Sequence, residues 1–233
     1  MAKGGKIKFV SKLIFWLFIF FLIFTIIPVI VYKFIHPPVT PLMCLRTLEM
    51  KIDGNPVNWS YKWISIEKMS PYLFQAAIAA EDDHFMLHNG FDIEAMQLAF
   101  ESNQKNEKKI KGGSTISQQT AKNVFLWPHR DYLRKGFEAW FTVLIEFIWG
   151  KERIMEVYLN VVELGDGIYG VEAASQKYFK KPASKLTKAE AAALIAVLPN
   201  PHIYKVLNPS AYTQYYKWAI LKRMEQMPKL SFR

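Results

Sequence analysis

The most constraining feature of this sequence is a run of twenty uncharged residues, from Leu13 to Tyr32. As an α-helix the run would be about 30 Å long, which matches the hydrocarbon core of a bilayer. Four lysines precede it, and no acidic residue occurs before Glu49. Because positively charged flanks remain on the cytoplasmic side, we expect a membrane-spanning helix whose N-terminus lies inside the cell.

A cleaved signal peptide is the alternative interpretation of this run. It would have a shorter apolar core, followed by a cleavage site of small residues. The sequence continues instead with Ile35-His36-Pro37-Pro38, which favours an uncleaved anchor.

Composition narrows the class of the remaining chain. About half of the 233 residues are hydrophobic and 15% are aromatic, which excludes a disordered tail. The single Cys44 excludes an internal disulfide framework. The net charge is +10, and five of the lysines lie before or at the end of the apolar run. The smaller excess that remains suits an anionic lipid surface or a phosphate-bearing substrate.

We divide the chain into a basic cytoplasmic tail (1–12), a transmembrane helix (13–32), a linker and membrane-proximal segment (33–59) and a folded domain (60–233). Pro37-Pro38 is typical of a linker. Weak alternation around Asp53-Gly54 predicts a short hairpin within residues 45–66.

Beyond Ser70 the pattern predicts helix after helix, so the expected fold class is mainly α. Ser70-Pro71 is a start signal, Asp92 and Asp131 are candidate caps, and Thr115 with Gln118 forms a capping box. A second capping box, Thr187 with Glu190, precedes a helix that ends before Pro199. The remaining helices are expected at 152–160, 170–179 and 210–227.

Three acidic residues, Glu81-Asp82-Asp83, directly follow an apolar helix. Acidic side chains are unfavourable at the negative end of a helix. A solvated turn is the simplest interpretation. The functional interpretation is a general acid or base whose pKa is raised in a partly apolar cleft.

Two further segments carry polar groups that suit phosphate chemistry. Gly112-Gly113 precedes a helix, whose N-terminus can bind an anion. Arg134, Lys135 and Glu138 share one face of an apolar helix at i,i+3 and i,i+4 spacing. A surface salt bridge is the alternative for this trio. Paired carboxylates near cations suit glycosyl transfer from a phosphate leaving group.

Taken in order, five segments resemble the motifs of the peptidoglycan glycosyltransferases, the family shared by bifunctional penicillin-binding proteins and stand-alone monofunctional enzymes. The resemblance covers about residues 60–230. The segments are Glu81-Asp82-Asp83-His84-Phe85, the stretch from Gly112 to Gln119, Arg134-Lys135-Gly136-Phe137-Glu138, the stretch from Lys151 to Asn160, and Gly167-Ile168-Tyr169-Gly170.

The resemblance implies a lysozyme-like bilobal fold and a monofunctional enzyme, without a transpeptidase domain, on the periplasmic face of the inner membrane. It would polymerise lipid II, transferring the undecaprenyl-pyrophosphate-linked glycan to the 4-hydroxyl of the acceptor GlcNAc with inversion. Glu81 matches the general base and Glu138 the second essential glutamate. Substrate-binding positions are implied at Ser114, Gln118, Gln119, Lys122, Arg130, Arg134, Lys135 and Asn160.

The resemblance implies no required cofactor and leaves room for a divalent cation, Mg²⁺ or Mn²⁺, beside Glu81. It implies as partners the lipid-linked substrates, the membrane and other cell-division or cell-wall synthesis proteins. No nucleic-acid partner is expected, because the aromatic residues fall mainly in apolar helical stripes. A lysozyme-type hydrolase and a non-catalytic cell-wall scaffold are the alternative functions.

Overall fold

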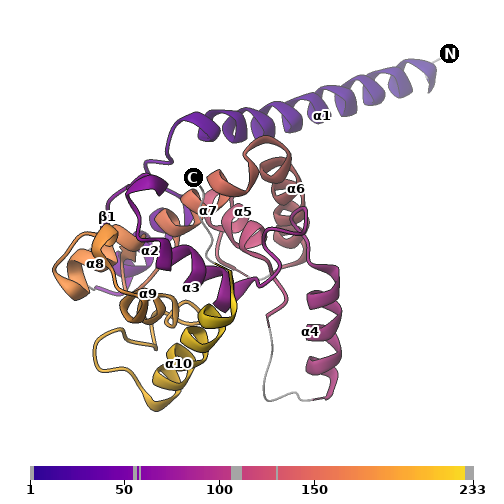
Figure 1. Cartoon of the computed structure of the whole chain (residues 1–233). Coiled ribbons are helices and arrows are strands. Elements are labelled where there is room, and N and C mark those ends of the chain that lie inside the picture. The colour runs from indigo at the N-terminus through magenta and orange to yellow at the C-terminus, as the bar shows by residue number, and fades with distance from the viewer. Residues whose placement is uncertain (1–2, 55–56, 58, 106–111, 130, 229–233) are drawn as a thin grey trace. The chain divides into compact units, whose positions relative to one another are not determined.

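The structure is a computed structural model that describes residues 3–54, 57, 59–105, 112–129 and 131–228. It divides into two compact units, residues 1–36 and 37–233. Figure 1 gives the labels of the helices and strands.

The first unit contains the helix α1 (Lys3–Phe34), which continues through Pro28 without interruption. Residues Lys8–Phe34 have a mean hydropathy of 3.0, and the helix is long and apolar enough to cross a membrane. A proline is tolerated in such a helix. This finding agrees with the predicted transmembrane anchor.

The second unit is mainly helical, as predicted. Its elements, in order, are α2 (Pro41–Ile52), β1 (Ser60–Tyr61), α3 (Pro71–Glu81), α4 (Ile93–Lys105), α5 (Ile116–Phe125), α6 (Tyr132–Ile148), α7 (Gly150–Val161), β2 (Ile168–Tyr169), α8 (Val171–Phe179), α9 (Lys188–Ile195) and α10 (Ala211–Gln226). Two 3-10 turns, Ile66–Lys68 and Ala183–Lys185, complete it.

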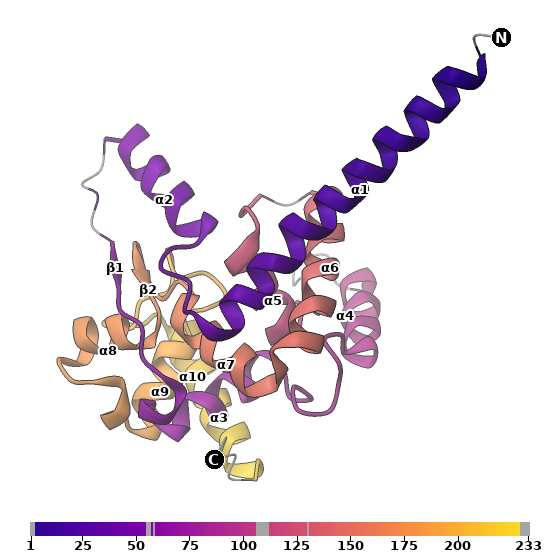
Figure 2. The same ribbon diagram turned by 90° about the horizontal axis from the view of Figure 1, so that it is seen from above.

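The sequence prediction of a short hairpin around Asp53-Gly54 is wrong for residues 41–52. They form the helix α2, because Thr40 caps it with a hydrogen bond from Met43 N and Pro41 occupies its first position. Asp53 is its C-cap. The nearby strand β1 pairs with the distant β2 in parallel, as Figure 2 shows, so the pairing is not a local hairpin.

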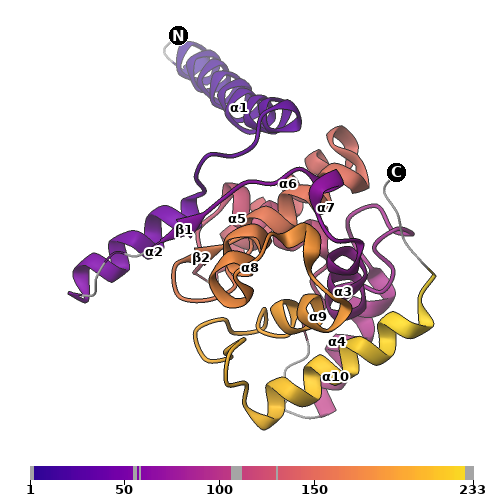
Figure 3. The ribbon, with the colours of Figure 1, turned by 60° about the vertical axis from the view of Figure 1, so that its left-hand side comes forward.

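The core lies around two groups of helices. In one, α5 packs against α6 and α7; in the other, α3 packs against α9 and α10, as Figure 3 shows for α3, α9 and α10. Helix α3 is buried from Leu73 to Ala79, and its alanines allow close approach of its neighbours. A helix that is apolar on all sides is an interior helix, so the residue at its end has a fixed position.

Candidate active site

The end of α3 places Glu81 at the boundary between the core and a pocket. Glu81 is the last residue of the helix and is half-buried. Its Oε2 accepts a hydrogen bond of 2.7 Å from Nε2 of Gln119 on α5. Burial raises the pKa of Glu81, while the Gln119 amide and the charge of Lys122 act in the opposite direction. A carboxyl whose pKa is raised in this way accepts a proton more readily than a solvated carboxylate does.

Asp82 joins the end of α3 to the start of α5. Its Oδ2 accepts a hydrogen bond of 2.9 Å from the backbone N–H of Ile116, the first residue of α5. Nε2 of His88 lies 2.9 Å from Oδ1 of Asp82, and the N–H of Gly90 donates to Nδ1 of His88. Since Nδ1 accepts, the proton of a neutral His88 is assigned to Nε2. Asp82 therefore fixes the turn that follows Glu81.

A second carboxylate, Glu138, lies two turns into α6 and is 3% exposed. Arg134 Nη1 donates to its Oε2 at 2.5 Å, and Lys135 Nζ donates to its Oε1. The ammonium of Lys135 also lies 3.4 Å from Oγ of Ser114. The contacts that the spacing of Arg134, Lys135 and Glu138 predicts are therefore confirmed. Arg134 and Glu138 are both buried.

Lys122 is a charged group that interacts electrostatically with both carboxylates. It lies on α5, one turn after Gln119, and is half-buried. Burial lowers the pKa of Lys122, whereas the negative charges of Glu138 and Glu81 raise it. A partly desolvated ammonium of this kind interacts strongly with an anion that enters the site.

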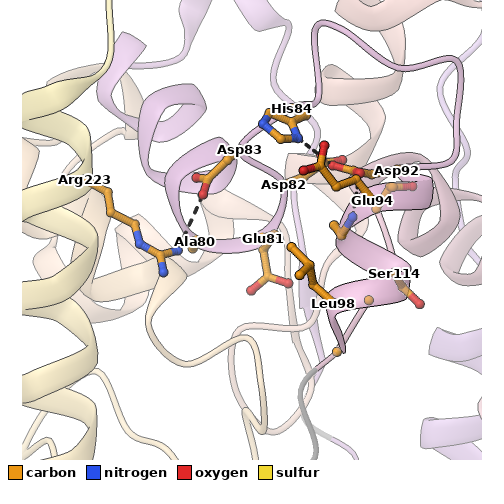
Figure 4. A pocket seen from close by; sticks show the side chains of 14 residues that line it. Ala80, Glu81, Asp82, Asp83, His84, Asp92, Glu94, Leu98, Ser114 and Arg223 are labelled. Atoms are coloured by element: carbon orange, nitrogen blue, oxygen red, sulfur yellow. Dashed lines mark hydrogen bonds and ion pairs between the residues drawn. The ribbon is translucent and has the colours of Figure 1, made fainter. Parts of the chain in front are cut away.

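Two pockets, each of about 330 Å³, are lined in part by these residues. Glu81 lines the first pocket, shown in Figure 4, together with Asp83, His84, Asp92 and Ser114. The second pocket is lined by Gln119 and Lys122 and by residues of α2 and of the 198–202 segment. Because Gln119 of the second pocket is hydrogen-bonded to Glu81 of the first, the carboxyl of Glu81 lies between them.

The two pockets differ in charge. The first is lined by five acidic side chains, with Arg223 as the fixed cation. The second contains Lys122 and Arg46, and among the described residues that line it Glu163 is the only acidic one. A polyanionic group is therefore accepted far better by the second pocket than by the first.

The other predicted site residues fall into three groups. One group lies beside the two carboxylates or lines the pockets, namely Ser114, Gln119, Lys122, Arg134 and Lys135. Gln118 is buried and completes the capping box of α5 with Thr115. Asn160 is fully buried and bonds the backbone of Ile64 and Glu156, so it supports the fold. Arg130 lies outside the described residues.

Sequence reasoning missed the contribution of α10. Tyr216 donates from its hydroxyl to the carbonyl of Ala80, and Arg223 donates to the carbonyl of Ala79. These bonds satisfy carbonyls at the end of α3 that lack a helical partner. The periodicity of α10 places both residues near one face, but only the packing of α10 on α3 reveals what that face contacts.

A divalent cation beside Glu81 requires several oxygen ligands. Among the described residues, no group of three or more His, Cys, Asp or Glu side chains has a ligating arrangement. Oε2 of Glu81 is already bonded to Gln119. The described side chains do not fit a metal site made by the protein.

A half-buried carboxyl at the end of an interior helix, between an acidic and a basic pocket, is suited to acid–base catalysis in a helical enzyme domain. Residues 52–225 match the family model described as Transglycosylase, so the chain belongs to the transglycosylase family.

Among curated proteins, it is similar to the biosynthetic peptidoglycan transglycosylase of Caulobacter vibrioides, with 53% identity over 88% of this chain and 86% of that protein. The proteins of the same name from Bacteroides thetaiotaomicron and Shewanella oneidensis are 48% and 49% identical. Their alignments cover 91% and 90% of this chain, and 86% and 88% of those two proteins, respectively.

Proposed function

We propose that the chain is a membrane-anchored peptidoglycan transglycosylase that polymerises lipid II. The position of Glu81 between the two pockets carries this proposal. The neutral sugar of the acceptor enters the first pocket, and the lipid-linked pyrophosphate of the donor lies beside Lys122. The names of the similar proteins and the family of the chain support the reaction class.

In the proposed reaction, Glu81 takes the proton of the 4-hydroxyl of the acceptor GlcNAc. That oxygen forms a bond to the anomeric carbon of the donor MurNAc as the bond to the pyrophosphate oxygen breaks. Attack from the face opposite the leaving group inverts the α-linkage and gives a β-1,4 bond. The electron pair stays on the pyrophosphate, whose developing charge is stabilised by Lys122.

Glu138 has a different role in this proposal. Its bonds to Arg134 and Lys135 hold both cations near Lys122, whose pKa the charges of Glu138, Arg134 and Lys135 all affect. Fixed cations stabilise a leaving group without reorganisation during the reaction. Glu138 is therefore a positioning residue that acts through Arg134 and Lys135.

The test is polymerisation of labelled lipid II by the full chain in detergent, with products separated on a gel. The wild type should give a ladder of lysozyme-sensitive glycan, and Glu81→Gln should be slower by about 10²–10⁴-fold. Glu152→Gln, at an exposed position of α7, is the matched control and should behave as the wild type. Release of fragments from finished cell wall, without use of lipid II, would favour a hydrolase. Inactivity of a folded wild type in both assays would favour a scaffold.

We also propose that the N-terminus is cytoplasmic and the folded domain periplasmic. Cys44 is the single cysteine of the sequence and is exposed on α2. A thiol reagent that does not cross the inner membrane should label Cys44 in intact cells. With Cys44→Ser, a cysteine placed at Ser11 should remain unlabelled until the membrane is opened. The reverse pattern would overturn the orientation.

A further inference from the structure

The solvent side of α10 carries exposed aromatic rings. Thr213, Ile220 and Met224 are buried and define the core side of the helix. Tyr215 and Trp218 lie away from that side and are 65% and 51% exposed. Their ring centroids are 6.0 Å apart, and Lys222 Nζ lies 4.6 Å from the Trp218 ring. Exposed aromatic groups of this kind mark interaction surfaces.

A second row of rings continues from this face to the active site. Tyr204 lies 5.1 Å from Tyr212, which stacks at 6.3 Å on Tyr216. Tyr216 donates to the carbonyl of Ala80, the residue before Glu81. Two turns further, Arg223 lines the pocket of Glu81, and Figure 4 shows it reaching towards Asp83.

The other end of this row adjoins the basic pocket. The backbone N–H of Tyr204 donates to the carbonyl of Asn200, and Asn200 lines the pocket that contains Lys122. The row of Tyr204, Tyr212 and Tyr216 therefore adjoins residues of both pockets. We call Tyr204, Tyr212, Tyr215, Tyr216 and Trp218 the aromatic face.

The chemistry of the aromatic face favours sugar rings over lipid. In α10, which is described throughout, the large hydrophobic side chains that are strongly exposed are all aromatic. Tyrosine and tryptophan present a flat apolar surface with a polar edge. A pyranose ring has a face of C–H groups that packs on such a surface, and hydroxyls that bond the polar edge.

Exposed aliphatic and phenyl side chains occur on other helices, among them α4 and α6. On α4 and α6 they are Ile93, Leu98, Phe100, Leu133, Val143 and Phe147. Those helices lack the tyrosine rows of α10. A surface that contacts acyl chains is better supplied by α4 and α6 than by the aromatic face.

We propose that the aromatic face binds the amino-sugar strand beyond the reacting residue. Lys222 and Arg223 flank the rings and complement the carboxylates that such a strand carries. This inference rests on the proposed function, because the strand is the donor and product of that reaction. A strand held there stays tethered between transfers, so that the next transfer begins at a high effective concentration.

The experiment compares the full-length wild type with Tyr215→Ala/Trp218→Ala in detergent. The probe is a fluorescent, lipid-free glycan strand of alternating GlcNAc and MurNAc, and its affinity is measured by anisotropy. We expect the double variant to bind about tenfold more weakly, since two ring contacts are lost. Tyr215→Phe should retain binding, because the ring remains. Tyr132→Ala, at a fully accessible tyrosine of α6, is the matched control.

Polymerisation gives the second readout. The rate of forming the first bond from lipid II should be unchanged in the double variant, while the strands become shorter. Equal glycan affinity and equal strand length in both proteins would overturn the proposal. So would a loss of binding to phosphatidylglycerol vesicles with unchanged glycan binding, which would make the face a membrane contact. If the wild type binds strands but does not polymerise lipid II, the proposed function fails separately.

Discussion

The end of α3 and the first turns of α6 each present a glutamate, and their surroundings differ. Glu81, at the end of α3, accepts a hydrogen bond from the neutral amide of Gln119, and burial raises its pKa. Glu138, on α6, is bonded by two cations, Arg134 and Lys135. The two glutamates therefore differ in the charge of the groups that bind them.

This difference assigns the roles in the proposed reaction. A general base must lose and gain a proton at the working pH, which requires a carboxyl without a tightly bound cation. A carboxylate held by an arginine and a lysine in charge-assisted hydrogen bonds fixes the positions of its partners. The surroundings of each glutamate thus indicate Glu81 for proton transfer and Glu138 for positioning.

Lys122 influences both regions, so its removal should have the largest effect after that of Glu81→Gln. Lys122→Met should lower kcat/KM for lipid II by about 10²–10³-fold, because a cation beside the leaving group is lost. It should also raise the pKa of Glu81, since the positive charge of Lys122 lowers it. The acid limb of the pH–rate profile then moves to higher pH, and activity at high pH is not restored.

Lys177→Met, at an exposed position of α8, is the matched control for this variant. It removes the same charge from the chain and should leave the profile unchanged. An equal loss in both variants would show that only net charge matters.

Glu138→Gln should have the next largest effect, on the order of 10- to 100-fold in kcat/KM. The glutamine keeps the shape but removes the charge that holds Arg134 and Lys135. Since Glu138 is not the proposed base, the loss should be similar at every pH and the acid limb should stay in place. Disappearance of that limb would identify Glu138 as the base and reverse the assignment of the two glutamates.

Gln119→Ala should give a smaller, pH-dependent effect. The Gln119 hydrogen bond stabilises the ionised form of Glu81 and lowers its pKa. Without that bond the pKa rises further, so a larger share of Glu81 is protonated at a given pH. The acid limb of kcat/KM should therefore move to higher pH, with near-normal activity well above it. Gln119→Glu would place a second carboxylate there and should move the limb further in the same direction. A movement to lower pH would contradict the role of this bond.

Much of the helical framework could be predicted because caps are local. The predicted capping boxes, Thr115 with Gln118 and Thr187 with Glu190, and the predicted cap Asp131 all form the hydrogen bonds expected of them. Asp92 similarly accepts from the N–H of Ala95. Helix α2 was missed because its apolar pattern is weak, although Thr40-Pro41 is a start signal that could have revealed it.

Within the candidate site, contacts inside one helix were predictable and contacts between helices were not. Arg134, Lys135 and Glu138 follow from spacing along α6. The bond from Gln119 to Glu81 depends on how α5 passes the end of α3, and the bond from Tyr216 to Ala80 depends on the packing of α10. The sequence pattern contains no short-range signal for either of these contacts.

The smallest expected effect on activity is that of weakening helix α9. Such a change alters the stability of the fold and leaves the surroundings of the two glutamates intact. Thr187 caps α9, which packs on α3, and forms a capping box with Glu190. Thr187→Ala should lower the free energy of unfolding by about 1 kcal/mol, while Thr187→Ser should retain most of it. Polymerisation should proceed at the wild-type rate, because a destabilised but folded α9 leaves Glu81 and its partner Gln119 in place. Thermal unfolding in detergent, beside the lipid II assay, measures both quantities. A fall in rate as large as that of Glu138→Gln, in protein that remains folded, would show that the position of α3 rather than the local chemistry of Glu81 limits the reaction.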